Sequence, residues 1–225
     1  MPDGYHFMKI YLKELEIILS NLEDLPNPKP ELEQWTTLPR IAAEMLMFAY
    51  QMGDITGKVC ADLGCGSGVL TAGLLILGAE TVYAVDIDIE AIETTRKNIE
   101  RISEAFGLPL KNRIILMHCD VRRLKQISVD TVVMNPPFGV EPQTKHADRY
   151  FLLKAFEIAR VVYSLYYSSL WRRRSLERSA REHGFESKLL KTFDFSLYAR
   201  FPFHKRKLKL IKVDFYMFRK ETSEA

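Results

Sequence analysis

Four consecutive residues, Asn135-Pro136-Pro137-Phe138, have the chemical types needed to hold an exocyclic amine. They follow an apolar, β-branched run at 129–134 that predicts a buried parallel strand. The proline pair ends that strand because neither proline can donate a backbone N–H. The stiff turn would hold a carboxamide, a proline carbonyl and an aromatic ring at the carboxyl end of a strand, where open α/β sheets bind ligands. The two oxygens could accept hydrogen bonds from a flat amine while the ring stacks on its base. For the tetrapeptide alone, an ordinary strand-to-loop turn is the alternative.

A glycine-rich turn, Asp62-Leu63-Gly64-Cys65-Gly66-Ser67-Gly68, is the second candidate for chemistry. Glycines let a ligand approach the backbone, and the N-terminus of a following helix offers free N–H groups. The G-x-G-x-G spacing differs from the G-x-G-x-x-G dinucleotide fingerprint. Asp62 would repel a pyrophosphate but suit a ligand that carries an ammonium group.

Acidic residues end two further predicted strands. Asp86 comes about 20 residues after the turn, where an acid commonly binds ribose hydroxyls. Asp120 could accept a hydrogen bond from an adenine amine. Each acid alone is more often a cap, but together with Asp62 and Asn135 they form a series of four strand ends. That series predicts one pocket for a cofactor that contains adenosine and an amino acid.

Alternating helices and strands must position these residues. Helices are predicted over 7–22, 39–52, 69–77, 89–106, 149–160 (with Asp148 as N-cap) and 171–183, and strands over 59–63, 81–87, 113–119, 129–134, 161–169, 189–199 and 208–218. The alternation predicts a mostly parallel, doubly wound α/β sheet with helices on both faces. The two consecutive late strands predict one antiparallel strand.

Charge is uneven along the 225 residues, which suit one domain. The net charge is +3, but residues 171–225 hold 15 Lys+Arg against 7 Asp+Glu, so the first 170 residues carry a net −5. This distribution favours an acidic partner such as nucleic acid, and a solvated basic face is the alternative. No apolar run approaches the ~20 residues that span a bilayer, and the N-terminus does not have the pattern of a signal peptide. The three cysteines lack metal-type spacing, which predicts that there is no metal site and that the thiols are reduced in a cytoplasmic protein. The lack of an apolar span predicts that there is no membrane partner.

The two motifs resemble those of a class I S-adenosylmethionine-dependent methyltransferase, and Asn135–Phe138 resembles the branch that methylates adenine N6, cytosine N4 or glutamine amides. Within that branch, the chain resembles the methyltransferase-like-5 family, which makes N6-methyladenosine in small-subunit ribosomal RNA. The likeness runs from about residue 13 to 218 and is carried by Leu32-Glu33-Gln34, Asp62–Gly68, Asp86-Ile87-Asp88, Cys119-Asp120-Val121, Met134–Gly139 and Phe203-His204-Lys205. Trp35 stands where this family commonly has Tyr.

The resemblance implies a Rossmann-like fold with a seven-stranded, mostly parallel sheet and one antiparallel strand. Residues 1–225 would form a single domain, with N-terminal helices and a cofactor-closing segment over 1–57 and the Rossmann-like core with its basic C-terminal part over 58–225. Eukaryotic members work with a small zinc-binding activator subunit that covers an exposed sheet edge, which suggests such a partner here.

The resemblance also implies residue roles around the cofactor S-adenosylmethionine and the target base. Gln34 and Thr37 would close over the methionine end, and Gly64, Gly66 and Ser67 would pass beneath it. Asp86 would hold the ribose, and Asp120 with Val121 would hold the adenine. Asn135 and the Pro136 carbonyl would accept hydrogen bonds from the target amine, held by the stiff turn through Pro137, while Phe138 stacks on the base.

Basic residues near the C-terminus predict contacts with RNA. Phe203, His204, Lys205, Arg206 and Lys207 combine basic and aromatic side chains, and Arg172-Arg173-Arg174 opens a predicted helix. The predicted function is therefore N6-adenine methylation of RNA. A protein glutamine N5-methyltransferase of the release-factor type and a non-catalytic RNA-binding assembly factor are the alternatives. Phe138 and the basic tail favour nucleic acid over the first, and two intact motifs argue against the second.

Overall fold

The computed structural model describes residues 10–125, 127–139, 141–197 and 209–221. Its helices are α1 (Leu12–Ser20), α2 (Pro39–Gln51), α3 (Val69–Ile76), α4 (Ile89–Phe106), α5 (Ala147–Ile158) and α6 (Leu170–Glu182). Its strands are β1 (Val59–Leu63), β2 (Thr81–Asp86), β3 (Ile114–His118), β4 (Val129–Met134), β5 (Ala159–Tyr167), β6 (Phe185–Leu197) and β7 (Lys209–Lys220). Short 3-10 turns join several of them. None of the helices in these ranges has the length and apolar character needed to cross a membrane.

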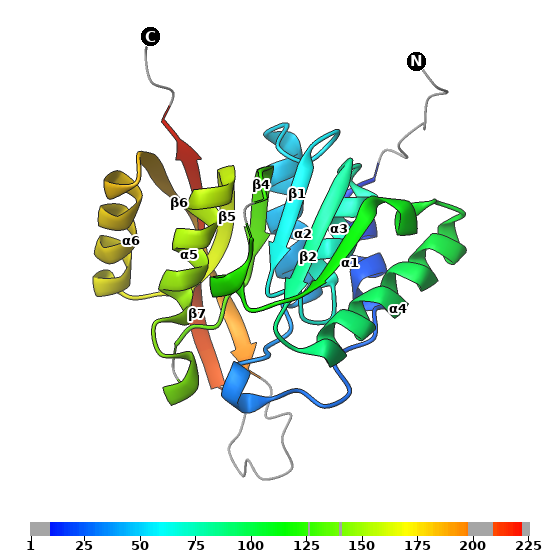
Figure 1. Cartoon of the computed structure of the whole chain (residues 1–225), viewed down its shortest axis with the longest axis horizontal. Coiled ribbons are helices and arrows are strands. Elements are labelled where there is room, and N and C mark those ends of the chain that lie inside the picture. The colour runs from blue at the N-terminus through cyan, green and yellow to red at the C-terminus, as the bar shows by residue number, and fades with distance from the viewer. Residues whose placement is uncertain (1–9, 126, 140, 198–208, 222–225) are drawn as a thin grey trace.

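The seven strands form one sheet in the order β3-β2-β1-β4-β5-β7-β6 (Figure 1). Strand β7 runs antiparallel to both neighbours, and the other pairs are parallel. The predicted α/β fold with one antiparallel strand is therefore confirmed. The strand order reverses at β1, which lies between β2 and β4. Ligands bind at the carboxyl ends of the strands that flank such a switch point.

Helices cover both faces of the sheet because side chains alternate along each buried strand. Cys60 packs on the face covered by α1 to α4, and its neighbour Ala61 packs on the face covered by α5 and α6. The first core cluster also holds Leu15 and Leu46, so the N-terminal helices share a core with the sheet. The division of the chain at residue 57 stays a prediction.

Some predicted element ends were wrong. Asp148 is not the N-cap of α5: His146 occupies that position with a left-handed backbone (φ 67°), and Asp148 lies in the first turn with a buried side chain. Arg160, predicted at the end of a helix, lies in β5. Strand β6 begins at Phe185, four residues before the predicted start, because it pairs with β7 from Phe185 onward. The polar residues in this stretch do not show the apolar alternation from which a strand is predicted. The start of β6 is defined by its pairing with a neighbouring strand.

Candidate active site

The two candidate motifs lie side by side at the carboxyl edge of the sheet. Asp62 of β1 pairs with Val133 of β4, so the glycine-rich turn and Asn135 leave adjacent strands in the same direction. One cavity opens between them. Its walls combine the glycine turn, the ends of β2 and β4 and the N-terminal connector: Leu25, Leu32, Glu33, Gln34, Trp35, Thr36, Thr37, Gly64, Cys65, Gly66, Ser67, Val69, Leu70, Asp86, Ile87, Asp120, Val121, Arg122, Asn135, Pro137, Gln143, Thr144, Lys145, Ala147, Tyr150 and Phe151.

The glycine-rich turn exposes its backbone to this cavity. Gly66 has a left-handed backbone (φ 55°), and a Cβ added there would meet nothing within 4 Å. Its N–H donates to Asp86 Oδ2 over 2.9 Å, which ties the turn to the end of β2. Gly68 is different, because a Cβ there would lie 2.8 Å from the side chain of Thr95. Gly66 thus leaves room for a ligand, and Gly68 lets α3 pack closely on α4.

Asp62 lies beneath the turn and does not line the cavity. Its side chain is fully buried, and Oδ2 accepts hydrogen bonds from the Thr71 N–H (3.0 Å) and the Thr71 hydroxyl (2.7 Å). Oδ1 has no hydrogen-bond partner among the described residues. Burial, opposed by the Thr71 bonds and assisted by the negative charge of Asp86, raises the pKa of Asp62 to about 7. The observed contacts of this carboxyl group anchor α3 under the glycine turn.

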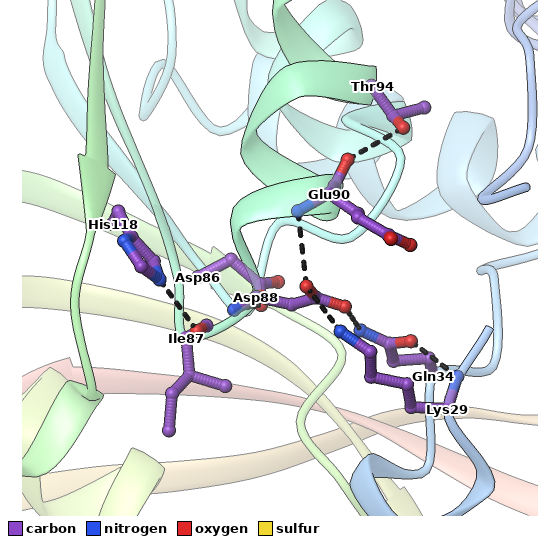
Figure 2. A network of polar contacts seen from close by, with 8 residues as sticks. All are labelled: Lys29, Gln34, Asp86, Ile87, Asp88, Glu90, Thr94 and His118. Atoms are coloured by element: carbon purple, nitrogen blue, oxygen red, sulfur yellow. Dashed lines mark hydrogen bonds and ion pairs between the residues drawn. The ribbon is translucent and has the colours of Figure 1, made fainter. Parts of the chain in front are cut away.

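A polar network joins the N-terminal connector to the turn after β2 (Figure 2). Asp88 caps α4 through the Glu90 N–H, and its carboxylate accepts hydrogen bonds from Lys29 Nζ (2.7 Å) and Gln34 Nε2 (2.8 Å). Burial would raise the pKa of Asp88, but these three hydrogen bonds outweigh that effect and lower it. Asp86 lies next to this network, where burial raises the pKa of its carboxyl group against the hydrogen bonds from backbone N–H groups. The network holds Gln34 against the same end of β2 that carries the predicted ribose acid.

Asp120 lines the cavity but already has a charged partner. Arg122 donates to both carboxylate oxygens, with Nε at 3.1 and 3.0 Å and Nη2 at 2.5 Å. These hydrogen bonds, chiefly, lower the pKa of Asp120. The Arg122 side chain is 63% exposed, so this pair can open at little cost. An adenine amine at this site would compete with the guanidinium for the same oxygens.

The side-chain amide of Asn135 is oriented by the N-terminal connector. Its Nδ2 donates to Thr37 Oγ1 over 3.0 Å and faces the Trp35 carbonyl oxygen at 3.4 Å. Because a backbone carbonyl can only accept, the NH₂ group must occupy this side and Oδ1 the other. Oδ1 is buried and has no partner among the described residues. The site therefore holds an oriented acceptor whose hydrogen-bonding capacity the protein leaves unused.

Comparison with known proteins identifies the family. Residues 42–136 match the family model "Ribosomal protein L11 methyltransferase (PrmA)", a span that contains the glycine turn and ends at Pro136. The chain is 38% identical to the rRNA N(6)-adenosine-methyltransferase METTL5 of Danio rerio over 92% of this chain and 98% of that relative. The Drosophila melanogaster Mettl5 is 36% identical over 93% and 97% of the two chains. The chain belongs to the METTL5 family. The crystal structure of PH1948 from Pyrococcus horikoshii, a candidate RNA methyltransferase by its description, matches with a TM-score of 0.84 at 44% identity and covers 96% of this chain and 100% of that one.

The METTL5-type structure brings most of the predicted cofactor residues to one cavity. Those that line it are Gln34, Thr37, Gly64, Gly66, Ser67, Asp86, Asp120 and Val121. Of the four residues predicted to handle the target base, Asn135 and Pro137 line the cavity, whereas Pro136 and Phe138 are buried outside its walls. The predicted RNA-binding residues Phe203, His204, Lys205, Arg206 and Lys207 lie outside the described residues.

The ring of Phe138 packs into the core of this METTL5-family chain. It is 5% exposed and meets Phe195 edge to face, with ring centroids 6.3 Å apart. Stacking on a base would require this ring to leave its present packing. The aromatic side chains that do line the cavity are Trp35, Tyr150 and Phe151.

Two arginines of the basic run, for which RNA contact and a solvated face were the alternatives, make internal ion pairs. Arg172 bonds Asp148 through Nη1 and reaches the Phe138 carbonyl oxygen at 3.4 Å through Nη2. Arg173 makes a two-pronged contact with the buried Asp214, at 2.8 and 2.9 Å. The charge run at the start of α6 therefore contributes to structure, and Arg172 ties α6 to the Asn135–Phe138 turn.

Proposed function

We propose that this chain is an S-adenosylmethionine-dependent methyltransferase that acts on the N6 amine of an adenine in RNA, with small-subunit ribosomal RNA as the substrate. The observation that carries the proposal is the unpartnered Asn135 Oδ1, a buried atom of a residue that lines the cavity at the strand switch point. A buried acceptor that lacks a hydrogen bond costs about 1–3 kcal/mol. A donor from a ligand would remove that cost, and an exocyclic amine is such a donor. The substrates in the names of the METTL5 relatives support the same choice.

The residues around the cavity fit this cofactor. The open backbone at Gly66 gives space for close approach, and Asp86 offers carboxylate oxygens at the end of β2 for a ribose. Gln34 and Thr37 supply further polar groups to the cavity wall, and Leu25 and Leu32 supply apolar surface. When bound, S-adenosylmethionine supplies a methyl group on a positively charged sulfur. The acids that line the cavity would favour that positive charge.

The residues of this chain would act chiefly by positioning. The lone pair of an adenine amine is delocalised into the ring, which makes the amine a weak nucleophile. An N–H that donates to Asn135 Oδ1 would favour a pyramidal nitrogen whose lone pair points away from the ring. The Pro136 carbonyl would serve as a second acceptor only after a shift of the turn, because Pro136 is buried outside the cavity walls. Asn135 is neutral, so we assign it no role as a base, and the surplus proton goes to water after transfer. Positioning of this kind can contribute roughly 7–11 kcal/mol, and presenting an unpaired or flipped base costs a few kcal/mol.

Aromatic and basic groups would hold the RNA. The Trp35 carbonyl oxygen faces the Asn135 amide, so the two residues are neighbours. Because the Phe138 ring packs on Phe195, we assign base stacking to the ring of Trp35. Lys145 lines the same cavity, where its ammonium group can reach a phosphate. The sequence at 203–207 adds further basic and aromatic side chains to this proposed RNA surface.

A partner subunit would cover the free edge of β3. Strand β3 pairs only with β2 among the described strands, and Ile115 on it is 42% exposed. Ile87 and Ile89, which flank the turn after β2, are about half exposed as well. An exposed strand edge flanked by apolar side chains is suited to strand addition by another protein. We assign this edge to a small zinc-binding activator subunit. The three cysteines form no disulfide, which supports a cytoplasmic location.

A protein glutamine N5-methyltransferase is the second candidate, because Asn135–Phe138 also resembles the motif of that branch; the description of the matched PrmA model names a protein substrate but no glutamine. That match stops at Pro136 and covers the cofactor half of the chain, so it carries little information on the substrate. An RNA-binding factor without catalytic activity is the third. The oriented and unused acceptor at Asn135 argues against it, since a binding factor has no need of one.

Radiolabelled cofactor separates these functions. The chain is incubated with total RNA or with purified release factors, and the labelled product is digested and identified. Label in N6-methyladenosine supports the proposal, label in protein supports the second candidate, and no label supports the third. Asn135→Ala should abolish methyl transfer while cofactor affinity stays within a few-fold, and Asn112→Ala, at an exposed asparagine on a 3-10 turn, serves as the matched control. An equal loss of transfer and cofactor affinity in Asn135→Ala would mean that this residue shapes the cofactor pocket.

A further inference from the structure

Glu33 is a buried acid in the middle of the N-terminal connector. It is 4% exposed, although the connector around it is bounded by prolines and partly exposed. Its carboxylate accepts hydrogen bonds from the Phe138 N–H (2.7 Å), the Glu141 N–H (2.9 Å) and the Thr144 hydroxyl. All three donors belong to the segment that continues from the Asn135–Phe138 turn, more than 100 residues later in the chain. The Glu33 carboxylate thus holds the C-terminal side of the Asn135–Phe138 turn, which is predicted to bind the target amine.

The backbone at Glu33 is held in a conformation that favours glycine. Its φ is 50°, and only His146 shares a left-handed backbone among the non-glycine residues of the described ranges. Such a backbone is strained and persists only where its surroundings hold it, often at a functional site. His146 follows the residues that Glu33 bonds, so both strained positions hold the same part of the chain. The conformation turns the Glu33 side chain inward, while the Trp35 N–H donates to the Glu33 carbonyl over 2.7 Å.

The segment that Glu33 binds is tightly folded and depends on this carboxylate. A Cβ added at Gly139 (φ 75°) would meet the Thr144 carbonyl oxygen at 3.3 Å, so the chain doubles back closely. Hydrogen bonds to a charged acceptor are about twice as strong as those between neutral groups. Loss of this acceptor would leave two backbone N–H groups, that of Phe138 in the buried interior and that of Glu141 at its margin, without their hydrogen-bond partner.

The neighbours of Glu33 reach the two halves of the site. Gln34 donates to Asp88 at the cofactor end of the cavity, and the Trp35 carbonyl faces the Asn135 amide at the target end. Glu33 itself bonds the backbone on the other side of the same Asn135–Phe138 turn. Three consecutive residues therefore connect the cofactor wall to both sides of the turn.

We propose that Glu33 is a positioning residue for methyl transfer: it fixes the turn that carries Asn135 at the distance from the cofactor that in-line transfer requires. The inference rests on the proposed function. Glu33 acts through the backbone of Phe138 and Glu141, because its carboxylate oxygens are bonded to that segment. Loss of the carboxylate would let the turn relax while Gln34, Asp86 and the glycine turn keep their own contacts.

Glu33→Gln tests the proposal. The variant replaces one accepting oxygen with an NH₂ group that faces a donor, so at least one of the bonds to Phe138 and Glu141 is lost. We expect the rate constant kcat to fall roughly 100-fold, the loss that a misplacement of about 1 Å can cause. The dissociation constant of S-adenosylmethionine, measured by calorimetry, should stay within three-fold. Hydrogen exchange of the Phe138 and Glu141 amides should become at least ten-fold faster. Glu31→Gln, at an exposed acid two residues earlier, is the matched control and should change none of these values.

Two results would overturn the proposal: an unchanged kcat, or a loss of cofactor affinity as large as the loss of kcat. If Glu33→Gln does not fold, Thr144→Val removes a single donor to the same carboxylate and is judged by the same three measurements, with a several-fold fall in kcat expected. If the unmodified chain transfers no methyl group to RNA, the proposed function fails, and the exchange rates still decide whether Glu33 holds the turn.

Discussion

Asp62→Asn should remove a specific pH dependence from the stability of this chain. The unmodified carboxyl group has a pKa of about 7 in the folded state against an ordinary value of 3.8, chiefly because it is buried. Between these two pH values the folded chain holds the proton and the unfolded chain does not. The free energy of unfolding therefore falls as the pH rises from about 4 to about 7, and the stability that the neutral form provides is lost above that range.

The structure sets the size of the effect. A shift from 3.8 to about 7 corresponds to a loss on the order of 4 kcal/mol at 1.36 kcal/mol per pH unit. Asparagine cannot ionise, so the variant lacks this loss. Its Nδ2 would occupy the place of Oδ1, which has no partner among the described residues, at a cost of about 1–3 kcal/mol that does not depend on pH. The difference in unfolding free energy between variant and parent should therefore rise by about 4 kcal/mol in favour of the variant between pH 4 and 8.

Urea unfolding of both proteins at half-unit steps of pH measures this difference. The comparison cancels the contributions of shifted acids that do not interact with Asp62, such as Asp88. Asp194→Asn is the control, because this acid is exposed on β6 and 69% of its side chain is accessible. A difference between Asp62→Asn and its parent that stays flat across the whole pH range would refute the reasoning.

Three further changes test other parts of the structure. Arg172→Met leaves Asp148 buried without its charged partner and should lower the free energy of unfolding by about 3–5 kcal/mol in urea titrations, and a change below 1 kcal/mol would show that the pair contributes little. Replacing Lys205, Arg206 and Lys207 together with alanine should flatten the plot of log affinity for RNA against log salt concentration by about 0.7 for each lost phosphate contact, and an unchanged slope would place RNA elsewhere. Phe138→Leu should destabilise the fold by about 1 kcal/mol through lost packing on Phe195 while the KM for RNA stays the same, and a raised KM with full stability would return Phe138 to the role of base stacking.

The sequence predicted the sheet and its ligand-binding edge because these features have local signals. Glycines and prolines stop strands and helices at fixed positions, and the acids at the carboxyl ends of β2 and β3 stand next to apolar runs that only a buried strand explains. The neighbouring positions of the glycine turn and Asn135 then followed from the order of strands in a doubly wound sheet. The sheet has that strand order, and it brings most of the predicted cofactor residues to one cavity.

The contacts that organise the site could not be predicted in the same way because their partners lie far apart in the chain. Gln34 bonds Asp88, and Glu33 bonds the segment after Phe138. Nothing near Glu33 in the sequence indicates that this acid is buried. The charge pattern left open whether Arg172 and Arg173 face RNA or solvent, and each has an acidic partner that only the folded chain brings near. Asp62 has the expected residue type, yet its position on β1 places it under the turn and not in the cavity wall.

A crystal structure with a conjugate that joins the N6 nitrogen of adenosine to the methionine side of the cofactor tests the central claim most directly. We expect the N6 nitrogen to lie about 3 Å from Asn135 Oδ1, with the Asn135 NH₂ group still on Thr37 and the cofactor portion over Gly66. An adenine bound away from Asn135, with Oδ1 still unpartnered or turned to another protein group, would contradict the account.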